Sequence, residues 1–202
     1  MKNVITISRE YGSGGREIGE KLAAKLGVPF YDNEIISRAA KETGFSEAIF
    51  EQAESKATNS LLYSIAMGMN LYPGQDMAFA GLSLDDRVFL AQSNIIRKVA
   101  EEGPCVIVGR CADYILKDHK NVINIFVQAS VDFRIARAIE QYSLSKTTAA
   151  EQVLKNDKRR ANYYKYHAGD RWANMKNYDL SIRSDFGGID HAVECIVKYL
   201  EV

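Results

Sequence analysis

The chain has 202 residues and a mass of 22.6 kDa, which is the size of one globular domain, so we expect residues 1–202 to form a single domain. Its 26 Lys and Arg residues balance its 26 Asp and Glu residues, which argues against a general binder of nucleic acid or of an anionic membrane. Hydrophobic residues make up 47% of the chain, with only 3 Pro and 14 Gly, which argues against disorder and collagen-like repeats.

The cysteines and the N-terminus predict a cytoplasmic protein. Cys105, Cys111 and Cys195 have no metal-binding spacing and leave an odd thiol, so we interpret them as packing residues in a reducing compartment. The first apolar run stops at Ser8, so it is too short for a signal peptide. No stretch approaches the roughly 18 apolar residues that a membrane span needs.

The first part of the chain predicts two strands, each followed by a helix. Residues 4–7 form a short β-branched run that leads into a glycine cluster, and apolar positions spaced by four then predict a helix that ends at Gly27. Residues 28–31 predict the second strand, and the next helix ends near Gly44. The stretch 46–81 is harder to place. Part of it has helical apolar spacing, which we interpret as core packing, with a partner-subunit surface as the alternative: Leu61, Leu62, Ile65 and Met69.

The second part of the chain continues the alternation of helices and strands. Helices are predicted over residues 84–102, from 131 to 142, in the basic stretch 155–166 and at the C-terminus, and strands over residues 105–108, 122–127 and 178–182. Because the strands are continuous apolar runs, they predict an α/β fold with a parallel sheet covered by helices on both faces.

The glycine cluster after the first strand is the first candidate site. Its backbone N–H groups and the following helix N-terminus suit a phosphate, and the residues concerned are Gly12, Ser13, Gly14, Gly15, Arg16 and Glu17. Aligned with the P-loop pattern, Arg16 takes the place of the lysine, and Glu17 takes that of the hydroxyl residue and is a candidate magnesium ligand. A tight turn without a ligand is one alternative. A dinucleotide-binding loop with Asp32 on the ribose is another.

Arginines gather near the predicted carboxyl ends of the strands. Asp32 and Arg38 flank the start of the second helix, and Arg110 follows the third strand, where its guanidinium suits a phosphate. Four more arginines belong to the segments after the fourth strand and are interpreted as part of a mobile lid over a transferring phosphoryl group: Arg134, Arg137, Arg159 and Arg160. A solvated helix face is the simpler alternative for them. RNA stacking on the nearby aromatic residues is disfavoured by the zero net charge.

Together these segments resemble the cytidylate kinase-like family of P-loop nucleoside monophosphate kinases. The resemblance covers nearly the whole chain and is carried by residues 7–16, 30–32, 106–113, 158–164 and 177–180. It implies a three-layer fold with a five-stranded parallel sheet, a helical monophosphate-binding segment at about residues 32–83 and a helical lid at about residues 141–170.

The resemblance also implies roles for single residues. Asp32 and Arg38 have the spacing with which the family holds the monophosphate, and Gly109 and Arg110 match its glycine and arginine after the third strand. Cys111 stands where the family has an aspartate. The lid arginines of the family look similar to Arg134, Arg137, Arg159 and Arg160.

The implied activity is transfer of the ATP γ-phosphoryl group to CMP or dCMP with Mg²⁺. Two alternatives stay open: a nucleotide-binding regulatory module that lost efficient catalysis through Arg16 and Glu17, and a kinase for a non-nucleotide small molecule. Nucleotides are the expected partners, without nucleic acid or membrane, and whether the chain forms a dimer is left open.

Overall fold

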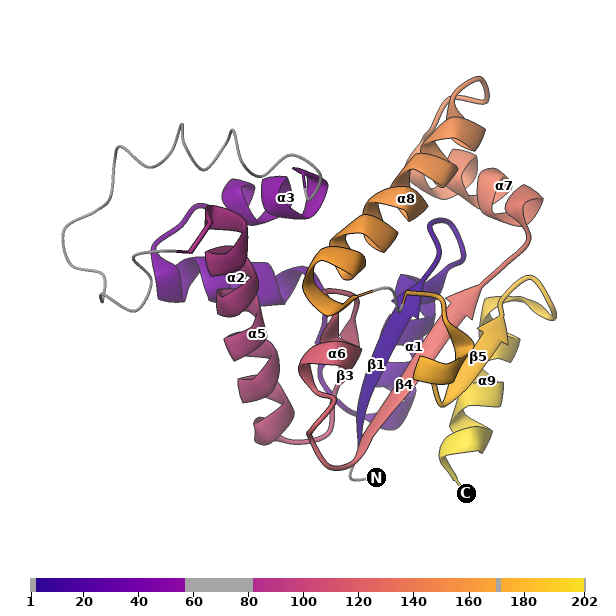
Figure 1. The fold of residues 1–202 in the computed structure, drawn as a ribbon. Coiled ribbons are helices and arrows are strands. Elements are labelled where there is room, and N and C mark those ends of the chain that lie inside the picture. The colour runs from indigo at the N-terminus through magenta and orange to yellow at the C-terminus, as the bar shows by residue number, and fades with distance from the viewer. Residues whose placement is uncertain (1–2, 57–81, 170–171, 202) are drawn as a thin grey trace.

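Five parallel strands form the centre of the computed structural model, which describes residues 3–56, 82–169 and 172–201. The strands are β1 (Val4–Arg9), β2 (Phe30–Tyr31), β3 (Val106–Val108), β4 (Val122–Gln128) and β5 (Leu180–Arg183). Their order in the sheet is β2-β3-β1-β4-β5 (Figure 1). The predicted α/β fold with five parallel strands is confirmed. The dinucleotide alternative is wrong, because β1 here lies between β3 and β4, whereas a Rossmann sheet places β2 next to β1.

The helices follow the predicted alternation, with additions where the sequence signal is weak. Their bounds are α1 (Gly15–Leu26), α2 (Asn33–Thr43), α3 (Glu47–Lys56), α5 (Leu84–Glu102), α6 (Ala112–Ile115), α7 (Val131–Tyr142), α8 (Ala149–Ala168) and α9 (Gly188–Leu200), with a 3-10 turn at Met175–Asn177. Helices α3 and α6 were not predicted as separate elements. The positions interpreted as core or partner surface lie outside the described residues: Leu61, Leu62, Ile65 and Met69.

Two apolar clusters divide the helices between the faces of the sheet and make three layers. Side chains such as Ile5 and Val106 pack with α1 and α9 on one face. Side chains such as Ile107 point to the other face, where they pack with α2, α5, α6 and part of α8. Because successive residues of a strand point to opposite faces, one continuous apolar run supplies both clusters.

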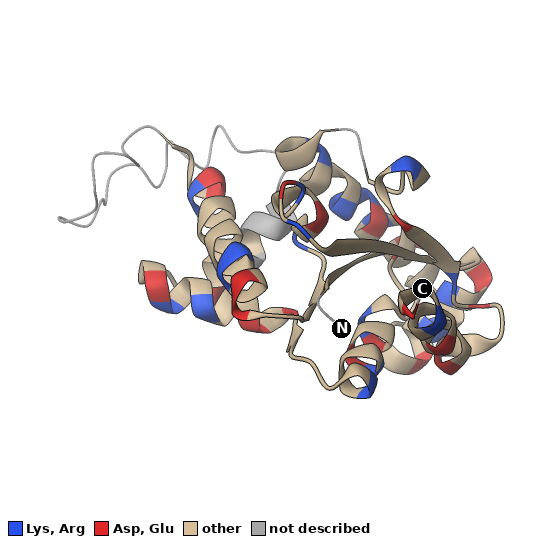
Figure 2. Cartoon of the chain, turned by 90° about the horizontal axis from the view of Figure 1, so that it is seen from below, with Lys and Arg blue, Asp and Glu red and all other residues tan. Residues whose placement is uncertain are grey.

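Residues of both charge signs occur along the helices. Lys and Arg alternate with Asp and Glu on the helices in the view of Figure 2. Within the described part of the chain, no helix has the length and apolar character required to cross a bilayer.

Candidate functional site

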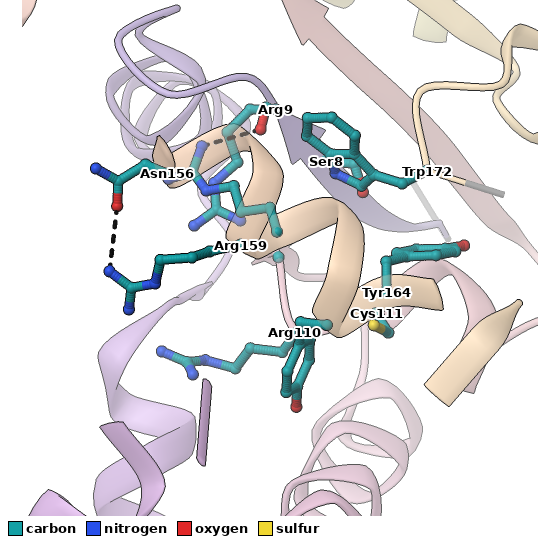
Figure 3. Close-up of a pocket in the computed structure, with 11 residues that line it drawn as sticks. Ser8, Arg9, Arg110, Cys111, Asn156, Arg159, Tyr164 and Trp172 are labelled. Carbon is teal, nitrogen blue, oxygen red and sulfur yellow. Dashed lines mark hydrogen bonds between the residues drawn. The ribbon is translucent and has the colours of Figure 1, made fainter. Parts of the chain in front are cut away.

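A cavity of about 210 Å³ lies where β1 and β3 end, and α8 covers it (Figure 3). Two adjacent parallel strands bring their carboxyl ends to one edge of the sheet, which is where ligands bind in open α/β folds. Four arginines, three aromatic residues and small polar or apolar groups line it: Ser8, Arg9, Gly109, Arg110, Cys111, Asn156, Arg159, Arg160, Tyr163, Tyr164 and Trp172.

The glycine turn between β1 and α1 lies against α7 and α9. Gly12 has φ +79°, and a β-carbon there would lie 2.5 Å from the carbonyl oxygen of Arg134. Gly14 has φ +80° and precedes the first residue of α1, and a β-carbon there would lie 2.3 Å from Cδ1 of Ile189. No larger residue fits at either position. The turn therefore presents bare backbone at a helix N-terminus, the arrangement that binds phosphate in P-loops.

Arg134 fastens the glycine turn to α8 and does not line the cavity. Its side chain is 4% exposed, and its Nη1 donates to the carbonyl oxygen of Tyr11 at 3.3 Å. It forms ion pairs with Glu10, at 3.4 Å, and with Asp157 of α8. Asp157 also accepts a hydrogen bond from the Tyr11 backbone N–H at 2.6 Å. Two carboxylates thus balance this arginine, which the sequence analysis assigned to the lid.

Arg137 and Glu17 form a second ion pair beside the turn, with Nη2 and Oε2 2.8 Å apart. Lys21 approaches the other carboxylate oxygen at 3.2 Å. Burial acts to raise the pKa of Glu17, but hydrogen bonds from Arg137 and Lys21 outweigh it and lower that pKa. Glu17 is therefore ionised, as a magnesium ligand must be. A metal ion at the Glu17 carboxylate would have to replace either Arg137 or Lys21.

Asp32 lies between two of the predicted site residues. Its Oδ2 is 2.8 Å from Nε of Arg16 and its Oδ1 is 3.8 Å from Nη2 of Arg110. The Arg16 side chain is 57% exposed and extends from the first turn of α1 to Asp32, at the end of β2. Arg110 is held by the carbonyl oxygen of Asp32 at 3.2 Å and by Oδ1 of Asn33 at 3.4 Å.

The turn after β3 has an unusual backbone. Gly109, Arg110 and Cys111 have φ values of +78°, +56° and +54°, so three successive residues adopt the left-handed conformation. For residues other than glycine this conformation costs about 1–2 kcal/mol each. Such strain is often found at functional sites, and here it places all three residues on the cavity wall.

Arg38 is not brought into the cavity. Its guanidinium is 2.9 Å from Glu34 one helical turn earlier and 3.6 Å from Glu102, and it stacks over the ring of Tyr31. Arg38 and Arg110 were both expected to hold the acceptor phosphate, but the two side chains lie in different surroundings.

Arg9 lines the cavity but was not among the predicted site residues. It shares the cavity with Arg159, which is exposed and contacts Asn156, and with Arg160, whose Nη1 donates to the carbonyl oxygen of Arg9 at 3.0 Å. The sequence contained one signal for Arg9, its place at the end of the first strand, directly before the glycine turn. Tyr163 and Tyr164 belong to the basic, aromatic stretch that carries part of the family resemblance, whereas Trp172 had no signal in the sequence.

Helix α8 is also fastened on the side away from the glycine turn. Tyr163 donates to Oε1 of Gln92 in α5 at 3.0 Å, and Tyr164 donates to Oδ2 of Asp113 in α6 at 2.6 Å. His167 stacks on Phe89 of α5, with ring centroids 3.9 Å apart and planes at 6°. The same helix therefore joins the glycine turn to α5 and α6.

Protonation of His167 is expected to loosen this attachment at acidic pH. Burial lowers the pKa of His167 from 6.5 to about 4, with Asp86 opposing the shift. The unfolded chain binds this proton first, so stability is lost as the pH falls below 6.5 towards 4. Because the ring is partly exposed and solvent screens it, we expect His167 to account for about 1 kcal/mol of the loss between pH 7 and pH 5. Urea unfolding at both pH values should show a smaller loss in His167→Phe, and an equal loss would contradict the assignment.

The comparisons with known proteins bear on the fold and the family of the chain. The chain shares its fold with P-loop kinases: a shikimate kinase from Bacteroides thetaiotaomicron matches with a TM-score of 0.58 and 14% identity over 100% of both chains. A crystal structure of an uncharacterized protein from Eubacterium ventriosum ATCC 27560 matches with a TM-score of 0.71 and 28% identity over 99% of both chains. A cytidylate kinase from Ignicoccus hospitalis is 21% identical over 98% of both chains. The model of the cytidylate kinase-like family matches residues 4–185, and the chain belongs to this family.

Proposed function

We propose that this protein transfers the γ-phosphoryl group of ATP to a nucleoside monophosphate, with CMP or dCMP as the acceptor. The observation that carries the proposal is the cavity beside the glycine turn, into which β1, β3 and α8 bring four arginines. Phosphoryl transfer needs positioning and positive charge more than a covalent nucleophile, and this cavity supplies both.

The residues divide into a donor side and an acceptor side. The backbone of Gly12 to Arg16 forms the donor side, at the N-terminus of α1. Arg110 forms the acceptor side, where Asp32 and Asn33 orient its guanidinium. Arg159 and Arg160 project from α8 between the two sides and neutralise charge during transfer.

ATP when bound supplies the phosphoryl group, and Mg²⁺ neutralises its oxygens. Magnesium keeps several waters and takes one or two protein carboxylates together with substrate phosphates, so it needs no cluster of protein ligands. The described residues contain no group of three acidic, histidine or cysteine ligands, and Glu17 is the carboxylate we propose for it.

The transfer balances without a catalytic base. The bond from the γ-phosphorus to the bridging oxygen breaks, and its electron pair stays on ADP. An oxygen of the acceptor phosphate forms the new bond, and because that oxygen is already ionised, no proton is removed. The total charge of the products equals that of the substrates.

The aromatic residues of the cavity wall favour a nucleotide as the acceptor over a small polar molecule. Tyr163, Tyr164 and Trp172 offer aromatic surface on which a base can stack. Cys111 is a specific departure, because a buried thiol stands where the family pattern has an acid, and it keeps a non-nucleotide acceptor as the second candidate.

The test is an acceptor panel with ATP and Mg²⁺, with products quantified by chromatography. We expect diphosphate from CMP or dCMP above that from UMP, AMP or GMP, and no product from shikimate. Arg160→Ala should lose this activity, while Arg183→Ala, which removes an exposed arginine of β5 that is paired with Asp185, should retain it. Product from shikimate alone would favour the second candidate, and nucleotide binding without turnover would favour the regulatory module.

A further inference from the structure

Arg9 is the last residue of β1, and its side chain passes between two glycines to reach the cavity. A β-carbon at Gly15 would lie 2.5 Å from Cβ and 2.9 Å from Cγ of Arg9. A β-carbon at Gly109 would lie 2.1 Å from Nη1 of Arg9. Any larger residue at either position would displace the arginine, so both glycines leave space for it.

The start of α1 sets how the glycine turn aligns with a P-loop, in which the strand is followed by G-x-x-x-x-G-K-[ST] and a helix. Gly14, in the left-handed conformation, directly precedes α1 and corresponds to the second glycine of the pattern. In this alignment Arg9 stands at the first glycine and Gly15 stands at the lysine. Relative to the pattern, the cation and the glycine have therefore exchanged places in this chain. The two residues concerned, Arg9 and Gly15, are in contact.

The charge of Arg9 is not balanced by an ion pair among the described residues. Burial lowers the pKa of Arg9, with Asp32 opposing and Arg16 adding to the shift. Arg160 lies beside it, and burial together with the positive charge of Arg9 lowers the pKa of Arg160 to about 9. Two adjacent guanidinium groups in one cavity, neither paired with a carboxylate in the described chain, form a site for a multiply charged anion.

We propose that Arg9 binds the β- and γ-phosphates of the donor in place of the P-loop lysine, reaching them from the end of β1. The inference rests on the proposed phosphoryl transfer and names the residue that carries its central charge. Arg16, the residue first assigned to this role, directs its guanidinium to Asp32 and orients that carboxylate beside Arg110.

The test exchanges the two residues. Arg9→Gly removes the cation, and we expect kcat to fall about 100-fold and a non-hydrolysable ATP analogue to bind about tenfold more weakly. The double variant Arg9→Gly/Gly15→Lys places a lysine on a helical backbone with the clashing side chain removed, and it recreates the G-x-x-x-x-G-K spacing. We expect the double variant to recover at least about tenfold of the lost kcat, which a purely structural role of Arg9 would not produce.

The controls distinguish three causes of lost activity: misfolding of the variant, loss of the Arg9 charge, and a role of Arg16 in place of Arg9. Thermal unfolding identifies a variant that fails to fold, and Arg9→Met, which keeps the aliphatic stem, then replaces Arg9→Gly as the single variant. Arg16→Ala is the matched control and should reduce kcat less than the loss of Arg9. A folded Arg9 variant with wild-type kcat and analogue binding, a larger loss in Arg16→Ala, or a folded double variant without recovery would overturn the proposal.

Failure of the proposed function has a different signature. If the wild-type chain forms no product with any acceptor, the transfer reaction fails as a proposal, and binding of the ATP analogue decides the role of Arg9. Weaker binding in the Arg9 variant with unchanged binding of adenosine would support the phosphate contact. Unchanged binding of the analogue would overturn it.

Discussion

Replacing Arg134 with methionine is expected to lower the free energy of unfolding by about 3 kcal/mol. The side chain is 4% exposed and balances the carboxylates of Glu10 and Asp157, which would be left without it in a partly buried place. Removing one partner of a buried ion pair is costly, because the charge that stays has lost both water and its counter-ion. Urea unfolding at neutral pH measures the change.

Two comparisons test the cause of this loss. Arg159→Met removes an exposed arginine from α8 and should change stability by less than about 0.5 kcal/mol. Adding Asp157→Asn to Arg134→Met removes an unbalanced carboxylate and should recover part of the loss in a double-mutant cycle. If Arg134→Met loses less than about 1 kcal/mol, the ion pairs do not fasten the glycine turn as described.

Replacing Arg110 with alanine is expected to reduce kcat/KM for the acceptor about 10- to 100-fold, with little change in KM for ATP. The expected size is that of a hydrogen bond to a charged group. Arg110 lines the cavity, and it is held in place by the carbonyl oxygen of Asp32 and by Oδ1 of Asn33. Steady-state kinetics with each substrate varied in turn separate the acceptor from the donor.

The left-handed backbone at Arg110 requires a second variant. Alanine is strained at φ +56°, whereas asparagine adopts this conformation more readily, so Arg110→Asn removes the guanidinium with less backbone cost. Arg38→Ala is the matched control, because its guanidinium is held by Glu34 and Glu102 outside the cavity, and we expect less than about a fivefold effect. Equal losses in Arg38→Ala and Arg110→Ala would show that both arginines hold the acceptor, as the family spacing suggested.

The sequence was sufficient to predict the strands because each is a short apolar run bounded by glycine, proline or polar residues. Strand order was not predicted, because an apolar run does not specify its neighbours in the sheet, and the family resemblance implied only that the sheet has five parallel strands. Helix α6 has only four residues and follows β3 through a left-handed turn, so it lacks the length at which helical periodicity can be recognised.

The candidate site was predicted in position but not in its side-chain partners. Glycine clusters and residues that follow strands are visible in a sequence, and they marked the edge of the sheet at which the cavity lies. Where Arg16 would reach depended on Asp32, which follows β2, and Arg38 is held both by Glu34 of its own helix and by Glu102 of α5. Arg9 was missed because its access to the cavity depends on the absence of side chains at Gly15 and Gly109, which are far apart in the chain.

The left-handed turn after β3 has a consequence for which residues this wall of the cavity can accept. Valine is close to cysteine in size and would suit the apolar neighbours of Cys111, but a β-branched residue at φ +54° is strongly disfavoured. Asparagine and aspartate are polar in a buried place, yet their backbones tolerate this conformation. Substitution tables based on side-chain volume and polarity would therefore rank the residues at position 111 in the wrong order, because main-chain geometry limits the choice first.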